Sequence, residues 1–237
     1  NDWRPDAIIH TAYRKGDRAS IVEASAHVAE AAAASGARLV HLSSDVVFGG
    51  RTEAYTEHDA LSPAFEYGYD KADAESLVRE LNPAAVLVRT SLLIGRTRLS
   101  SHEIMVRDAI ERRSPITFFT DEVRNPLIVD DLAAACTLLA ERPEVRGPLH
   151  VAGPDPLSRA ELATMIARRH GWDESRLRFG TLAGSGLDRP AHVELDSSLA
   201  RSMGPAARGP AAASSSGSSL ASSSCSSRAR PPARPRS

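Results

Sequence analysis

Short apolar runs alternate with amphipathic or alanine-rich stretches along most of this chain. The runs typical of buried strands lie at 6–13, 37–44, 84–95, 116–119 and 147–153. Stretches with helical periodicity lie at 18–36, 67–81, 101–113, 129–142 and 158–171. Because strands alternate with helices, the pattern predicts an α/β fold with a parallel, Rossmann-like sheet flanked by helices.

Helix-end signals support several of these boundaries. Gly36 ends the alanine-rich helix, and Ser158 with Glu161 forms a capping-box pattern. Asp130 and Asp131 suit the first turn of a helix, where carboxylates complement the helix dipole. In the first helix, a predicted buried stripe runs through Ile21, Ala24, Val28, Ala31 and Ala32.

Composition narrows the class of protein. Hydrophobic residues make up 42% of the 237 residues and charged residues 25%, which is typical of a soluble globular protein. No apolar run is long enough to span a bilayer, so we expect no membrane partner. Cys136 and Cys225 do not suggest a disulfide framework, which predicts a reducing cytoplasm. The eight histidines lack metal-ligand spacing, so no metal is expected.

Residues 205–237 differ sharply from the rest. They consist almost entirely of Ser, Ala, Pro, Arg and Gly, with five Arg and no acid, whereas residues 1–204 carry a net charge of −6. Such a segment buries too little apolar surface to offset its ordering entropy, so we predict a disordered tail after a domain at 1–204. A basic tail can bind nucleic acid, but we interpret this one as solvated and expect no nucleic-acid partner.

The ends of the predicted strands hold the candidate chemistry, because α/β sheets bind ligands at the carboxyl ends of their strands. Three segments qualify, namely Thr11-Ala12-Tyr13, Ser43-Ser44-Asp45 and Arg89-Thr90-Ser91. A further candidate stretch, YGYDK at 67–71, follows the Ser43-Ser44-Asp45 segment along the chain.

Tyr67 and Lys71 are four residues apart and share one helix face. A nearby lysine cation favours the phenolate and lowers the tyrosine pKa from about 10 toward neutrality. With the Ser44 hydroxyl, this pair could polarise a carbonyl and deliver a proton to it. Such pairs also occur on ordinary surface helices, and the pair alone favours that simpler interpretation.

The wider pattern favours the catalytic interpretation. Seven segments of the chain together resemble the extended short-chain dehydrogenase/reductase family. They are PDAIIHTAY, HLSSDVVFGG, YGYDKADAE, LVRTSLLIG, NPLIVDDLAAA, GPLHVAGPDPLSRAELA and, near residue 200, RPAHVELDSSLA. The dTDP-4-dehydrorhamnose reductases are the most similar branch. The resemblance covers roughly residues 3–204 and implies that Ser44, Tyr67 and Lys71 are catalytic. It also implies that Lys71 binds the nicotinamide ribose of NADP or NAD.

The resemblance and the strand ends together predict two further sets of residues. The predicted cofactor-binding residues are Thr11, Ala12, Tyr13, Ser43, Tyr67, Lys71, Arg89 and Thr90, and the predicted substrate-binding residues are Ser44, Val46, Tyr67 and Asn125. The expected reaction is NAD(P)H-dependent reduction of a nucleotide-linked 4-keto sugar. A non-catalytic binding or regulatory protein and a nucleotide-sugar epimerase are alternatives, and a homodimer is left open.

The chain departs from the family pattern in two places. Val46 follows Asp45, where related dehydratases carry a glutamate, which argues against dehydration. The family's first strand and Gly-x-x-Gly-x-x-Gly loop are missing from the sequence, and we interpret roughly 50–60 residues as absent. We therefore expect an exposed sheet edge at 6–13, impaired cofactor binding, and a small substrate-side subdomain from 96–120 and 150–204.

Overall fold

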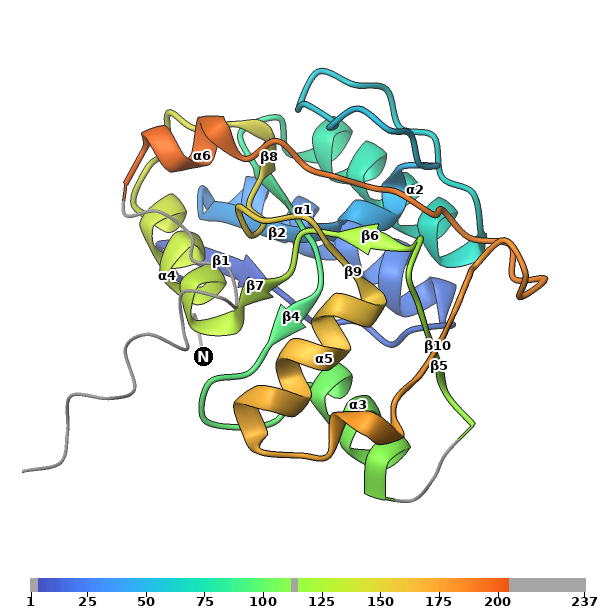
Figure 1. Cartoon of the computed structure of the whole chain (residues 1–237). Coiled ribbons are helices and arrows are strands. Elements are labelled where there is room, and N and C mark those ends of the chain that lie inside the picture. The colour runs from blue at the N-terminus through green and yellow to red at the C-terminus, as the bar shows by residue number, and fades with distance from the viewer. Residues whose placement is uncertain (1–3, 112–114, 205–237) are drawn as a thin grey trace, which may run out of the picture.

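A four-stranded parallel sheet organises the part of the chain that the computed structural model describes, residues 4–111 and 115–204 (Figure 1). Its strands, in order across the sheet, are β1 (Ala7–His10), β2 (Arg38–Ser44), β3 (Val86–Thr90) and β8 (Gly147–His150). All three pairings are parallel. The predicted α/β fold is confirmed, and the predicted tail at 205–237 lies outside the described residues.

Helices cover both faces of this sheet. α1 (Ala24–Ser35) and α2 (Glu66–Leu81) pack on one face, where Leu39 and Leu87 are buried. α4 (Val129–Ala140) packs on the other, over Val40 and Val88. Successive residues of a strand point to opposite faces, so these consecutive apolar residues supply both cores.

Strand β1 forms an edge of the described sheet, as its sequence predicts. Ile9 keeps 41% of its surface exposed there. The helix that follows begins with a π-helical turn, η1 (Ala19–Glu23), before α1. Ile21, Ala29 and Ala32 are buried, whereas Ala31 is exposed, so the predicted stripe is wrong at Ala31. A π turn holds more residues than an α turn, which rotates the buried face of the following helix.

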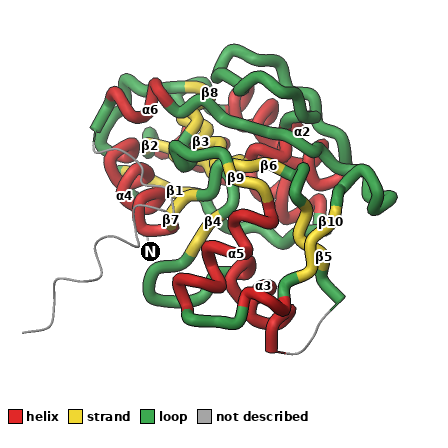
Figure 2. Tube along the Cα trace, viewed as in Figure 1, coloured by secondary structure: helices red, strands yellow, loops and turns green. Residues whose placement is uncertain are grey.

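A second core lies beside the sheet. α3 (Ser101–Glu111) and α5 (Arg159–His170) pack with β5 (Thr117–Phe119) through an apolar cluster that includes Val106, Phe118 and Ile166. Figure 2 shows these helices together at one end of the molecule. Ser158 and Glu161 form the predicted capping box at the start of α5.

Short elements complete the architecture. β4 (Leu93–Ile94) pairs with β7 (Leu127–Ile128), β6 (Val123–Arg124) with β9 (Leu157–Ser158), and β10 (Arg178–Gly180) with β5. η2 (Asp45–Val47), η3 (Glu174–Arg176) and α6 (Ser198–Ser202) are single turns or little more.

The predicted strand 84–95 is in fact two strands. β3 ends at Thr90, and the chain then leaves the main sheet so that β4 pairs with β7. Across the described residues, no helix is both long and apolar enough to cross a membrane. Within residues 4–111 and 115–204, no three or more His, Cys, Asp or Glu side chains form a cluster suited to a metal ion.

Candidate active site

The first turn of α2 is packed against the carboxyl end of β2. Gly68 makes this approach possible, because a Cβ atom at that position would lie 2.4 Å from the carbonyl oxygen of Val46. That distance is far inside van der Waals contact, so only glycine fits without a shift of the backbone. The packing brings Tyr67 and Lys71 to the end of the strand that carries Ser44.

Lys71 is a buried cation at this strand end, with 5% of its surface exposed. Its Nζ donates a hydrogen bond to the carbonyl oxygen of Leu42 at 3.2 Å. The same Nζ lies 4.2 Å from the centroid of the Tyr13 ring, a cation–π contact. Burial lowers the pKa of Lys71 to about 8, and the charge of Glu75 opposes that shift.

Tyr67 lies among aromatic and cationic groups. Its ring stacks on that of Tyr13 with centroids 5.9 Å apart, and Nζ of Lys15 lies 5.4 Å from its centroid. Burial raises the pKa of Tyr67, and hydrogen bonding with Tyr13 and the charge of Asp45 raise it further. The sequence led us to expect the opposite shift. In the structure the Lys71 ammonium contacts the ring of Tyr13 rather than that of Tyr67. Because the pKa of Tyr67 is raised, its side chain is a neutral phenol, which is the form able to give up a proton.

Ser44 ends β2 and is linked to a buried carboxylate. Its Oγ donates to Oδ1 of Asp45 at 3.1 Å, and Oδ2 of Asp45 accepts from Oγ of Ser91 at 2.6 Å. β2 ends at Ser44 and η2 begins at Asp45, so both groups lie at the carboxyl end of the strand. We call Ser44, Tyr67 and Lys71 the Tyr67 site.

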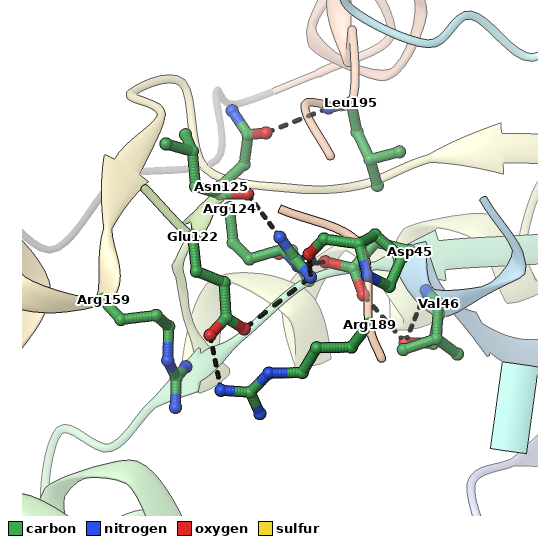
Figure 3. Close-up of polar contacts among 12 residues, drawn as sticks. Asp45, Val46, Glu122, Arg124, Asn125, Arg159, Arg189 and Leu195 are labelled. Atoms are coloured by element: carbon green, nitrogen blue, oxygen red, sulfur yellow. Dashed lines mark hydrogen bonds and ion pairs between the residues drawn. The ribbon is translucent and has the colours of Figure 1, made fainter. Parts of the chain in front are cut away.

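A network of arginines and carboxylates adjoins Asp45 (Figure 3). Nε of Arg124 lies 3.7 Å from Oδ2 of Asp45, and Oε2 of Glu122 accepts from Nη2 of Arg189 at 2.7 Å. Arg124 donates its remaining bonds to backbone carbonyls of Val123, Pro190 and Ala191. This network fixes the 189–192 segment against the strand ends.

The side chains of two predicted site residues make structural contacts within the chain. Arg89 was predicted to bind cofactor, but it is fully buried against Glu75, with Nη2 to Oε2 at 2.8 Å. Asn125 was predicted to bind substrate, but its amide is buried and used by the backbone. Its Nδ2 donates to the carbonyl of Gly153 at 3.1 Å, and its Oδ1 accepts from the amide of Leu195 at 2.9 Å.

The other predicted residues lie near the Tyr67 site. Thr11, Ala12 and Tyr13 are exposed in the loop after β1, and Val46 is half-buried in η2. Ser43 and Thr90 are buried, and their hydroxyls have no hydrogen-bond partner within the described chain. Ligand contacts of these residues stay predictions.

Sequence reasoning missed Lys15, Arg159 and Arg189 as candidates. Their segments lie far apart along the chain and meet only in the folded structure. One signal was available for Lys15, because it and Lys71 are the only lysines in a chain with 27 arginines.

Stability measurements can test the environment of Lys71. Its pKa is lowered in the folded state from 10.5 to about 8, so the unfolded chain binds more protons between those values. The free energy of unfolding should therefore rise with pH across this window, where the burial penalty of the charged amine is relieved. Relative to Lys71→Met, the wild type should gain about 2–3 kcal/mol between pH 7 and pH 10.

Urea unfolding of both proteins at the two pH values measures this gain. Other titrating groups are common to both and cancel in the comparison. Parallel pH profiles for the two proteins would show that Lys71 titrates normally and is not desolvated.

The geometry and the comparisons with known proteins agree on the class of protein. A parallel sheet with a Ser, Tyr and Lys at its carboxyl end defines a Rossmann-like protein of the extended short-chain dehydrogenase/reductase class. The chain belongs to the RmlD substrate binding domain family, whose match covers residues 1–208.

Two curated relatives illustrate the range of the family. Methionine adenosyltransferase 2 subunit beta from Rattus norvegicus is 32% identical over 230 residues, which cover 89% of this chain and 68% of that protein. Spore coat polysaccharide biosynthesis protein SpsK from Bacillus subtilis is 33% identical over 162 residues, covering 68% of this chain and 56% of that protein.

Solved structures share the fold. The dTDP-4-dehydrorhamnose reductase from Bacillus anthracis, in complex with NADP, matches with a TM-score of 0.79 and 26% identity, over 90% of this chain and 79% of that chain. A hypothetical dTDP-4-dehydrorhamnose reductase from Sulfolobus tokodaii matches with a TM-score of 0.71 and 28% identity, over 86% and 75% of the respective chains.

Proposed function

We propose that this protein reduces the 4-keto group of a nucleotide-linked sugar, with NADPH or NADH as the source of hydride. The observation that carries the proposal is the docking of the first turn of α2 on the end of β2, where Nζ of Lys71 donates to the Leu42 carbonyl at 3.2 Å and β2 ends at Ser44. The similarity to the Bacillus anthracis reductase, solved with NADP, supports the same reaction class.

The side chains of the Tyr67 site suit the proton half of this reaction. Tyr67 is protonated at neutral pH and donates its proton to the carbonyl oxygen of the substrate. The Ser44 hydroxyl, which donates to Asp45 in this structure, must rotate to donate a hydrogen bond to the same oxygen. Lys71 can stabilise the phenolate left behind only after the Tyr13 ring, whose centroid now lies 4.2 Å from Nζ, has moved away. With a pKa of about 8, Lys71 can then also return a proton to Tyr67.

The nicotinamide half of a cofactor fits these residues. Among the described residues, Lys71 has one hydrogen-bond acceptor, the Leu42 carbonyl, which leaves N–H donors for ribose hydroxyls. Ser43 and Thr90 add two buried hydroxyls without partners in the described chain. The cofactor would supply hydride to the carbonyl carbon. Tyr13 must move off Lys71 for the ribose to reach the ammonium, because its ring now lies 4.2 Å from Nζ.

The affinity of the 237-residue chain for cofactor can be predicted. Its sequence contains no Gly-x-x-Gly-x-x-Gly loop, which in this class binds the pyrophosphate through backbone amides. Loss of two charge-assisted hydrogen bonds at about 1.5–3 kcal/mol each weakens binding by roughly 100- to 10,000-fold. Titration with NADH and NADPH, followed by nicotinamide fluorescence, should give millimolar dissociation constants. Saturation at micromolar cofactor would contradict this expectation.

A non-catalytic role is the second candidate. It is favoured by the 32% identity to methionine adenosyltransferase 2 subunit beta, a protein named as a subunit, and by the departure at Val46. Turnover separates the two candidates. We would assay NADPH oxidation with dTDP-4-keto-6-deoxy sugars, using this chain and a fusion that places the glycine-rich βαβ segment of a reductase relative before residue 4. A reductase predicts oxidation by the fusion. A folded fusion that binds NADPH but does not oxidise it supports the non-catalytic role.

A further inference from the structure

The side chain of Tyr13 occupies the Tyr67 site. Its ring centroid lies 4.2 Å from Nζ of Lys71, and the same ring stacks on that of Tyr67 with centroids 5.9 Å apart. Hydrogen bonding with Tyr13 also contributes to the raised pKa of Tyr67. One side chain therefore contacts both the cation and the phenol of the site.

The contact between Tyr13 and Lys71 is one that an oxygen ligand can replace. The Lys71 ammonium has three N–H donors, and the Leu42 carbonyl is the one hydrogen-bond acceptor that it has among the described residues. A π face attracts a cation but offers no lone pair for a hydrogen bond. A hydroxyl oxygen that binds Lys71 would therefore compete directly with the Tyr13 ring.

The other titratable groups that face Lys71 leave this competition to Tyr13. Burial and the Lys71 charge lower the pKa of His10 on β1 and that of His41 on β2, the latter to about 3, so neither histidine is charged at pH 7. The carboxylate of Glu75 favours the charged amine but already belongs to a buried ion pair.

The backbone on either side of Tyr13 is held in place. β1 pairs with β2 as far as His10, and Oγ of Ser20 accepts from the amide of Arg14 at 2.9 Å. Tyr13 itself keeps 48% of its surface exposed, so its side chain has room to turn toward solvent. Rotation of this side chain, rather than movement of the loop, is therefore the motion that uncovers Lys71.

We propose that Tyr13 is a gate residue, whose ring closes the Tyr67 site in the free protein and turns away when a ligand binds the Lys71 ammonium. The proposal rests on the proposed function for the identity of that ligand, a ribose hydroxyl of the nicotinamide cofactor. Opening the gate also changes Tyr67. It removes a hydrogen bond that raises the pKa of Tyr67 and leaves the Lys71 cation free to act on the phenolate. Ligand binding therefore makes Tyr67 a stronger acid.

Competitive labelling of amines tests the gate on the 237-residue chain without cofactor or turnover. Lys15 and Lys71 are its only lysines, so peptide mass spectrometry reports on each one separately. Trace acetic anhydride reacts with neutral amines, and labelling across pH 7–11 gives both the pKa of an amine and its limiting reactivity. Lys15 is exposed and supplies the rate for an open amine.

Tyr13→Ala should raise the limiting reactivity of Lys71 by about 10-fold, since the cation–π contact and the covering ring are both lost. The pKa of Lys71 should also rise from about 8 toward 10.5, because water replaces the ring. Tyr13→Phe is the matched control. It keeps the ring and removes the hydroxyl, so Lys71 should react as in the wild type.

Two results would overturn the gate. One is an unchanged reactivity and pKa of Lys71 in Tyr13→Ala, and the other is a Tyr13→Phe variant that behaves like Tyr13→Ala. If Tyr13→Ala does not fold, Tyr13→Ser is the second variant, with the same expected changes.

Cofactor binding tests what the gate opposes. In the fusion, NADPH should bind Tyr13→Ala about 10-fold more tightly than the wild type, because a closed site lowers apparent affinity by the fraction of molecules that are open. Equal or weaker binding by the variant would show that Tyr13 does not oppose the cofactor, and would overturn that part of the proposal. If neither fusion binds NADPH, the proposed function fails, and the labelling result still decides whether Tyr13 covers Lys71.

Discussion

Tyr67→Phe should lower the turnover number of the reductase fusion by about 10²- to 10⁴-fold, the usual contribution of a positioned general acid. The substitution removes the one proton that Tyr67 can deliver and keeps the ring that stacks on Tyr13. The dissociation constant for NADPH should change by less than about threefold, since no hydrogen bond of the phenol to cofactor is required by the account. Steady-state kinetics and fluorescence titration measure the two quantities.

Tyr69→Phe is the matched control. Tyr69 lies in the same helical turn and keeps 54% of its surface exposed, so its hydroxyl should not affect turnover. If both phenylalanine variants lose activity equally, or if Tyr67→Phe loses cofactor affinity in step with turnover, Tyr67 is not the acid.

Arg89→Leu should destabilise the protein by about 3–5 kcal/mol, because it leaves the buried carboxylate of Glu75 without its partner. The two side chains retain 2% and 0% of their exposed surface, and Nε of Arg89 also bonds Oε1 of Glu75 at 3.1 Å. Arg89 packs over the Phe48 ring, with its Cζ 5.2 Å from the ring centroid. Urea unfolding at pH 7 measures the loss.

The double variant Glu75→Leu with Arg89→Leu removes both charges. It should recover much of the loss, since a buried ion pair replaced by apolar side chains is often close to neutral in stability. A loss below about 1 kcal/mol for Arg89→Leu, or a double variant as unstable as the two single losses added together, would contradict a coupled ion pair.

The main sheet and its helices could be predicted from the sequence. Which face of a strand each side chain occupies was predicted less well. The alternation of apolar runs and helical stretches predicted the strands β1, β2, β3 and β8 and a parallel sheet, and the structure supplies their order. Arg89 was assigned to cofactor because it ends a strand. Its neighbours show where the Arg89 side chain lies instead of at the strand end, since Leu87 and Arg89 share the face covered by α2, whereas Val88 and Thr90 lie on the opposite face.

The part of the site that depends on local spacing and on family resemblance could be predicted from the sequence. The i, i+4 spacing placed Tyr67 and Lys71 on one face of α2. Gly68 then sets how closely that face approaches β2, which depends on the path of η2. The insertion of the Tyr13 ring over Lys71 has no sequence signal, because the loop after β1 positions it. Sequence reasoning therefore gave the wrong direction for the pKa shift of Tyr67.

The most direct test of the proposed reduction follows the hydride itself. The fusion is incubated with a dTDP-4-keto-6-deoxy sugar and NADPH deuterated at the transferring position of nicotinamide C4, and the product is analysed by NMR and mass spectrometry. The account predicts one deuterium per product molecule, bonded to C4 of the sugar, in step with oxidation of NADPH. Unchanged NADPH with a folded, cofactor-bound fusion, or an epimerised sugar free of deuterium, would contradict it.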